Sequence, residues 1–173
     1  MRSLYSSLIA MVAFVVFASM AAAADGHPAW DKQINNPGRF KKLGQFGNAA
    51  VFDKETGLVW EQSPDTNTRN WVSALTHCYQ RLVGGRKGWR LPTIEELASL
   101  VDPNNPGGDP DLPPGHPFAN VQSSFYWSAT TFAVSSSNAW GVYFVDGFVG
   151  DSGKGFDGFV WCVRGGQGID GVQ

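Results

Sequence analysis

Phe159-Val160-Trp161-Cys162-Val163 (FVWCV) is an uninterrupted apolar run close to the end of a 173-residue chain. Alternation along a strand would place Val160 and Cys162 on one face and the other three residues of the run on the opposite face. A strand that is apolar on both faces is typical of the centre of a sheet. We therefore expect a central strand over residues 159–163.

The first 24 residues have the pattern of a secretory signal peptide. Arg2 precedes an uncharged apolar run of 11 residues, 8–18, and small residues lead up to Asp25. A membrane anchor is the alternative, but a span needs about 20 apolar residues. We therefore expect a secreted or periplasmic protein that has no membrane span after cleavage.

Export decides how the two cysteines are interpreted. Cys78 and Cys162 are the only ones, and in an oxidising compartment they are expected to form a disulfide with each other. The alternative is a catalytic or redox thiol pair. The chain contains no C-x-x-C motif, and His77 is the only base near either cysteine in the sequence. The disulfide is the better interpretation.

Two segments show helical signals. Residues 71–83 have helical periodicity, with Asn70 as the N-cap and Gly84-Gly85 as the stop. The residues expected on the apolar face of this helix are Trp71, Leu75, Cys78, Tyr79 and Leu82. Thr93 and Glu96 form a capping box that starts a second, short helix.

Strand and loop signals fill the rest of the chain. Residues 49–52 and 58–60 predict a hairpin around a turn at 53–57, and residues 64–69 predict a polar loop. Residues 102–119 contain six Pro and three Gly, which excludes regular structure. Strands are expected at 125–130, at 139–145 and from Phe148, with a hairpin signal at Asp146-Gly147.

This element order predicts an α+β fold, with two helices packed on a small antiparallel sheet. We expect an irregular lead-in at 25–38, one domain at 39–166 and a flexible tail at 167–173. The long loop can pack down through apolar residues such as Leu112 and Phe118.

Composition excludes several functional classes. Aromatic residues make up 13% of the chain and charged residues 16%, unlike a disordered chain. The formal net charge of −2 argues against a nucleic-acid partner. The three His are scattered and show no ligand or triad spacing. We therefore expect no catalytic residues, no metal ligands and no cofactor.

Five phrases in order carry a family resemblance. They are FDKETGLVW at 52–60, WVSALTHC at 71–78, GWRLPTIEEL at 88–97, YWSAT at 126–130 and VWCVRGG at 160–166. The series resembles the Lcl C-terminal domain family, named for the end domain of a bacterial collagen-like adhesin. The resemblance implies a C-type-lectin-like fold, related to formylglycine-generating and sulfatase-modifying domains, with a disulfide from the first helix to the last strand.

The same resemblance implies glycan recognition, because the named adhesin's domain binds sulfated glycans. This chain lacks the E-P-N, Q-P-D and W-N-D triplets of calcium-dependent lectins, so calcium is unsupported. It also lacks the cysteine pair of the formylglycine-generating oxidases, since Cys162 stands alone near the C-terminus. We expect a non-enzymatic protein that binds a glycan or a surface protein, in adhesion or in a secreted or envelope assembly.

Candidate ligand-binding residues lie on the later strands and their turns. They are Trp127, Trp140, Tyr143, Asp146, Asp151 and Lys154. Exposed aromatic rings can pack on sugar C–H groups, and mixed charge can bind polar ligands, although core packing and a solvated hairpin rim are the alternatives.

Two further charged sets are less specific. The oxygen-bearing loop residues Asp102, Asn104, Asn105, Asp109 and Asp111 could ligate calcium or could simply form turns. The basic residues at the end of the first helix could bind a sulfated glycan or could complement the helix dipole. They are Arg81, Arg86, Lys87 and Arg90.

Overall fold

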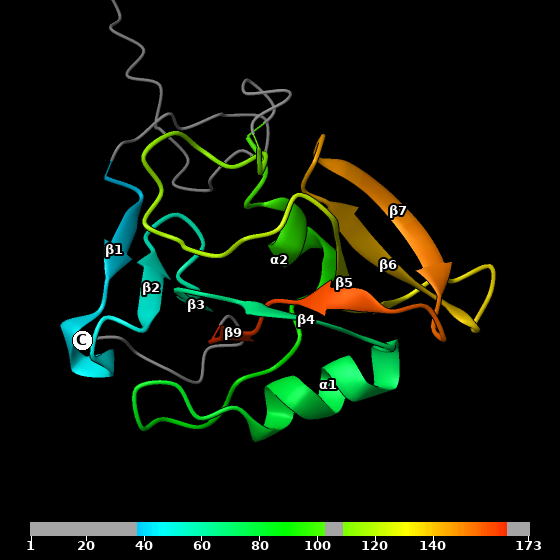
Figure 1. The fold of residues 1–173 in the computed structure, drawn as a ribbon, viewed down its shortest axis with the longest axis horizontal. Helices are drawn as coiled ribbons and strands as arrows, with labels where there is room; N and C mark the ends of the chain where they lie inside the picture. The colour runs from blue at the N-terminus through cyan, green and yellow to red at the C-terminus, as the bar shows by residue number, and fades with distance from the viewer. Residues whose placement is uncertain (1–37, 103–108, 166–173) are drawn as a thin grey trace, which may run out of the picture.

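The structure is a computed structural model that describes residues 38–102 and 109–165 (Figure 1). The expected signal peptide, nearly all of the lead-in and the tail lie outside these residues. The elements in chain order are β1 (Phe40–Lys42), the 3-10 helix η1 (Gly44–Phe46), β2 (Ala50–Asp53), β3 (Val59–Glu61), β4 (Asp65–Arg69), α1 (Trp71–Gln80), α2 (Ile94–Ala98), β5 (Phe125–Thr131), β6 (Asn138–Tyr143), β7 (Phe148–Gly153), β8 (Gly158–Val160) and β9 (Val163–Arg164).

The strands form two sheets where one was expected. The first has the order β1-β2-β3-β9 and the second β4-β8-β5-β6-β7. β8 pairs parallel to β5, whereas the other pairs are antiparallel. The helices α1 and α2 cover opposite faces of the five-stranded sheet (Figure 1). The α+β class is as predicted, but the second sheet is mixed because the chain returns beside β5 after the β6–β7 hairpin.

The apolar run 159–163 is divided between the two sheets. It begins in β8, crosses at Trp161 and Cys162, and continues in β9. The predicted alternation is confirmed, because Val160 and Cys162 lie in one core cluster and Trp161 and Val163 in the other. A single continuous strand was the wrong expectation, since the chain changes sheets within it.

Glu61 holds this crossover in place. Its backbone N–H donates to the Cys162 carbonyl at 3.1 Å, and its carbonyl accepts from the Trp161 indole at 2.9 Å. Its carboxylate accepts from the Cys162 amide at 3.0 Å and from Nε of Arg81 at 2.5 Å. Glu61 is only 1% exposed. Burial raises the pKa of Glu61, even though Arg81 and the Cys162 amide favour its charged form.

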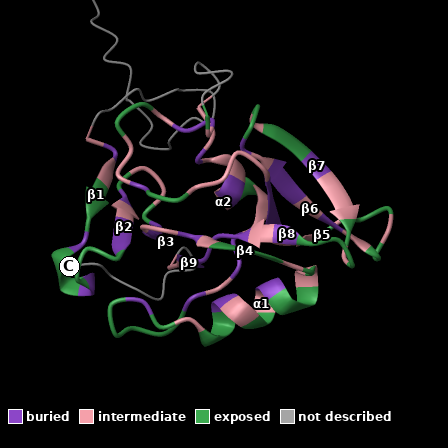
Figure 2. Ribbon diagram, viewed as in Figure 1, coloured by how far each residue is buried: buried purple, intermediate pink, exposed green. Residues whose placement is uncertain are grey.

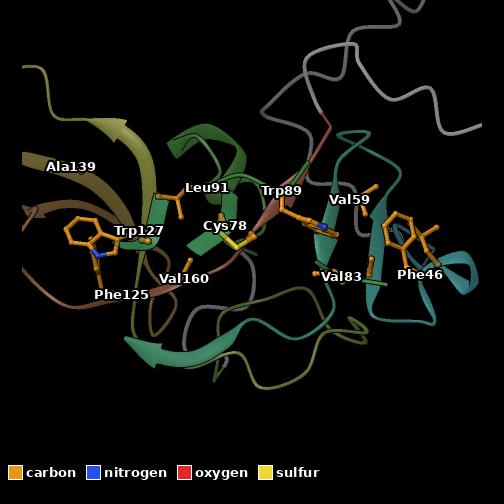
Figure 3. Packing of buried hydrophobic residues seen from close by; sticks show 14 residues of the cluster. Phe46, Val59, Cys78, Val83, Trp89, Leu91, Phe125, Trp127, Ala139 and Val160 are labelled. Carbon is orange, nitrogen blue, oxygen red and sulfur yellow. A yellow bond between two sulfur atoms is a disulfide. The ribbon is translucent and has the colours of Figure 1, made fainter. Parts of the chain in front are cut away.

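The disulfide between Cys78 and Cys162 is present, with a Cα–Cα distance of 5.4 Å. Figure 3 shows it among the buried side chains of one core cluster. It joins α1 to the crossover between the sheets, and the sequence separation of its ends is 84 residues. The disulfide inferred from the sequence is therefore part of the hydrophobic core.

The first helix ends three residues earlier than predicted. Asn70 caps it by accepting from the Ser73 amide, as expected, but the helix stops at Gln80. Arg81 is extended there, which lets its guanidinium reach Glu61. Two residues assigned to the apolar face are exposed: Leu82, which lies beyond the helix end, is 59% exposed, and Tyr79, which lies within the helix but off its inner face, is 82% exposed. Ala74 occupies the inner face with Cys78.

The second helix follows the prediction. Thr93 and Glu96 form the capping box, and Leu97 and Leu100 are fully buried. Arg90 adds a two-point ion pair to the Glu96 carboxylate, at 2.7 and 2.6 Å. A helix of five residues is short, so these caps and buried contacts must stabilise it.

Two irregular predictions need correction. Residues 64–69 were expected to form a loop, yet β4 pairs with β8 at the edge of the second sheet. An edge strand exposes much of its surface, so polar residues are tolerated there and no apolar pattern marks it. Similarly, β1 forms at the start of the expected domain, where no strand was predicted. In the described residues 109–119 no helix or strand forms, and Leu112 and Phe118 are buried, as expected.

Removal of the disulfide should destabilise the domain. In the double variant Cys78→Ala/Cys162→Ala, the unfolded chain regains the entropy of a long loop, and we expect a loss of about 4 kcal/mol in the free energy of unfolding. Urea unfolding followed by Trp fluorescence measures this. A reducing agent should destabilise the wild type and leave the double variant unchanged; equal stability of the two proteins without reductant would contradict the prediction.

Loss of the Glu61 carboxylate should also be costly. Glu61→Ala leaves Arg81 without its ion-pair partner and the buried Cys162 amide without an acceptor, so we expect a loss of about 3 kcal/mol in unfolding free energy. Glu61→Gln keeps an acceptor for the Cys162 amide and should lose less. Urea midpoints compare the three proteins, and an Ala variant as stable as the wild type would refute the role given to Glu61.

Candidate functional site

Trp127 cannot contribute to a surface site. The residue has no exposed surface, and its indole N–H donates to the Arg69 carbonyl at 2.9 Å. Its ring packs edge-on against Phe125 at 4.8 Å, and Phe156 lies 6.5 Å away. The prediction that Trp127 binds ligand is wrong, because its position in β5 points it into the core.

Trp140 and Asp151 come together on the face of the β6–β7 hairpin that carries Val142. They are directly opposed in the strand register. Trp140 packs edge-on against Phe132 at 5.0 Å, and the Asp151 carboxylate accepts from the side-chain amide of Asn138 at 2.7 Å. Both side chains therefore have partners within the hairpin and its approach.

Lys154 contacts other parts of the protein through both its side chain and its backbone. Its ammonium lies 4.1 Å from the centre of the Trp71 ring, and it donates to the Thr131 hydroxyl at 3.0 Å and the Ser136 carbonyl at 2.9 Å. Its carbonyl accepts from the Trp71 amide. Lys154 thus fixes the start of α1 to the later strands, and its charge is engaged within the protein.

Asp146 lies in the turn between β6 and β7, where its carboxylate accepts from the Phe148 amide at 3.1 Å. The long loop meets this turn, because the Asp111 amide donates to the Phe144 carbonyl at 2.7 Å. Burial raises the pKa of Asp111, and the carboxylates of Asp102 and Asp146 raise it further. Within residues 38–102 and 109–165, no three His, Cys, Asp or Glu side chains form a group able to hold a metal ion.

Tyr143 belongs to a row of aromatic rings on the opposite face of the hairpin. Phe125, Tyr143 and Phe148 face one another across β5, β6 and β7 in register. Their ring centres are 4.9 Å and 6.0 Å apart. Phe156, from the turn after β7, adds a fourth ring 6.0 Å from Phe125. We call these four residues the aromatic row.

The two ends of the row are open to solvent. Phe148 is 60% exposed and Phe156 is 52% exposed, while Phe125 is buried and forms the floor between Phe156 and Tyr143. In Figure 2, β7 is largely exposed or half-buried apart from its centre at Gly150. Helix α1 packs on β5 and β8, and β7 is the strand at the far edge of the same sheet.

Glycines allow the rings to lie close to the sheet. A Cβ at Gly150 would come within 2.7 Å of the Phe148 ring, and one at Gly141 would come within 2.3 Å of the Phe125 ring. The rings therefore occupy the space that side chains at these positions would fill. This arrangement presents the outer face of Phe148 to solvent.

Phe148 and Phe156 were not among the predicted ligand-binding residues, because the sequence pattern indicates only a strand and a turn at these positions. Phe is normally a core residue, so neither position stands out. The spacing of Phe148 and Gly150 was the available signal, because residues two apart on a strand share a face. Only the cross-strand register shows that these residues join Tyr143.

Most side chains of the expected basic patch have partners within the protein. Arg81 forms its ion pair with Glu61, and Arg90 with Glu96. The Arg86 guanidinium lies over the Phe46 ring at 5.0 Å. A cleft of about 220 Å³ lies beside the end of α1, and its lining includes Glu61 and Arg81.

A charged cluster links α1 to β4. Asp65 accepts from Arg69 at 2.7 Å and lies 3.6 Å from Nε2 of His77. Burial lowers the pKa of His77, and the cations Arg69 and Arg81 lower it further, against the attraction of Asp65. His77 is therefore neutral in the folded protein at neutral pH.

The described residues define an α+β domain of two sheets that are joined at a crossover and stapled by one disulfide. The chain belongs to the Lcl C-terminal domain family, whose model matches residues 49–164. This is an adhesin-type end domain and not a known enzyme family. No curated protein matches the chain. Neither helix in the described ranges has the length and hydropathy needed to cross a membrane.

The lowered pKa of His77 predicts that the free energy of unfolding depends on pH. Its pKa is lowered by folding, so the unfolded chain binds a proton first as the pH falls below about 6.5, the ordinary value. Stability should therefore decrease from neutral pH through this window. His77→Gln should show a smaller decrease, measured as urea midpoints at neutral and mildly acidic pH. The remaining slope is expected from His116, whose pKa burial also lowers; identical slopes in the two proteins would disprove the assignment.

Proposed function

We propose that the protein is an exported, non-catalytic binding domain that recognises carbohydrate at the aromatic row. The observation that carries this proposal is the aromatic row, whose end rings, Phe156 and Phe148, are open to solvent. The faces of aromatic rings pack against the C–H groups of sugar rings, and binding sites combine such surfaces with a few polar groups. The adhesin-type family supports a role in surface recognition.

The row is preorganised for binding. Gly150 and Gly141 let the Phe148 and Phe125 rings settle against the sheet, and the cross-strand register fixes their order. A ligand that stacks on such a surface orders few additional side chains, which reduces the entropic cost of binding. The Tyr143 hydroxyl, which can donate and accept, supplies a polar group beside the rings.

Export and fold type are part of the same proposal. The pattern of residues 1–24 supports secretion or delivery to the periplasm. A disulfide from the first helix to the last strands, with long loops on the later sheet, supports a variant of the C-type-lectin-like fold. The proposal includes no calcium and no other cofactor, because the lectin triplets are missing from the sequence.

A protein-interaction module in a secreted or envelope assembly is the second candidate. The outer face of α1 favours it, since Val72 and Tyr79 on the helix are well exposed, as is Leu82 just beyond its end. Exposed apolar residues that gather on one surface mark protein contacts more often than scattered ones do. This surface belongs to a different element from the aromatic row, so variants can separate the two functions.

Substitutions in the row should weaken glycan binding. Against soluble oligosaccharides identified on a glycan array, Phe148→Ala and Phe156→Ala should each weaken binding by about tenfold, which corresponds to about 1.4 kcal/mol. Isothermal titration calorimetry gives the affinities. Tyr79→Ala is the matched control, because it removes an exposed aromatic ring outside the row.

Two outcomes would count against the proposal. If no glycan binds, or if the row variants bind as well as the wild type, carbohydrate recognition at this site is wrong. Capture of a stoichiometric envelope protein that depends on Tyr79 and not on Phe148 would establish the protein-interaction role instead.

A further inference from the structure

We infer that the ligand of the aromatic row is an uncharged, β-linked oligosaccharide that spans several rings, and that the site discriminates against sulfated and other anionic glycans. This inference rests on the proposed function and specifies its ligand class. It is carried by the length of the row and by the charges at both of its ends.

The geometry favours an extended ligand. The rings run across β5, β6 and β7 and continue to the turn before β8, with neighbouring centres 4.9 to 6.0 Å apart. The exposed rings, Phe156 and Phe148, are the two ends of this line. A single sugar would cover only part of it, so both ends are used only by a chain of sugars. β-linked pyranose chains with equatorial hydroxyls are flat and present C–H groups on their faces.

The charges at the ends of the row are negative. Asp146 accepts from the Phe148 amide, and Asp157 follows Phe156 directly in the sequence; both aspartates are exposed. A sulfate or carboxylate on the ligand would approach these groups at either end. Like charges at an interface oppose binding, and they act chiefly on specificity and on the rate of association.

Positive charge near the row is engaged elsewhere. From Phe125 to Gly158 the sequence contains three Asp and a single cation, Lys154, whose ammonium contacts Trp71, Thr131 and Ser136. On the neighbouring strand β4, Arg69 is paired with Asp65. An anionic glycan would have to break one of these contacts to gain an ion pair, whereas an uncharged glycan requires none.

Oligosaccharide binding with defined probes tests the inference. Cellohexaose and chitohexaose are the uncharged probes, their disaccharides test length, and a heparin hexasaccharide is the sulfated probe. We expect at least one uncharged hexasaccharide to bind about tenfold more tightly than its disaccharide. Its affinity should be unchanged between low and high salt, because no ion pair forms. Heparin should not compete for the site.

Variants at Gly150 test the placement of the Phe148 ring. Gly150→Ala should displace that ring, because the added methyl occupies the ring's position. Binding of the uncharged hexasaccharide should therefore become weaker. The substitution should have no further effect in a Phe148→Ala background. Gly153→Ala on the same strand is the matched control, since a Cβ there meets only the Asn138 side chain at 4.0 Å. Melting temperatures of both variants should stay near that of the wild type.

Charge variants test the discrimination. Asp146→Asn/Asp157→Asn should narrow the ratio between the affinities for the uncharged hexasaccharide and for heparin, because the repelling charges at both ends of the row are removed. Salt-sensitive heparin binding by the wild type that is lost in Phe148→Ala would overturn the inference and leave carbohydrate recognition intact. Equal affinity for the disaccharide and hexasaccharide would also overturn it. Absence of binding to any glycan would overturn the proposed function as well.

Discussion

The buried side chain and backbone of Glu61 fix the point where the chain passes from one sheet to the other. Four hydrogen bonds from this residue involve Trp161, Cys162 and Arg81. A buried carboxylate is tolerated only when it is well paired, so the positions of these partners are strongly constrained. The disulfide then ties α1 to the same crossover. Both sheets and both core clusters meet at this point, and their relative placement depends on it.

The surface features follow from that arrangement. Arg81 leaves the helix to reach Glu61, which ends α1 at Gln80 and leaves Leu82 beyond the helix and exposed. In the second sheet, β8 inserts between β4 and β5, so β7 remains the edge strand at the far end, with Phe148 exposed. The core therefore determines which aromatic rings reach the solvent. The aromatic row is a product of strand register, glycine placement and the turn after β7 that supplies Phe156.

Local patterns predicted the parts of the fold that depend on local physics. The capping box at Thr93 and Glu96 and the alternation around Cys162 were read correctly, because each involves neighbouring residues with a fixed geometry. The strand β4 was missed because its pairing with β8 is non-local and its side chains are polar. The site was predicted only in part: Tyr143 lies in it, Trp127 is buried, and Phe148 was overlooked. Exposure of an aromatic ring depends on which strands flank it, and a single sequence does not encode that locally.

The pairing of β9 with β3 has a consequence for folding. The first sheet is closed by Val163 and Arg164, and the disulfide needs Cys162, so segments far apart in the sequence must meet before the core is complete. Contacts of such long range slow folding. A fragment without residues 162–164 would lack both the disulfide and the last strand of the first sheet. Both core clusters also draw on residues from the two ends of the described chain, so neither half of the domain contains a complete core.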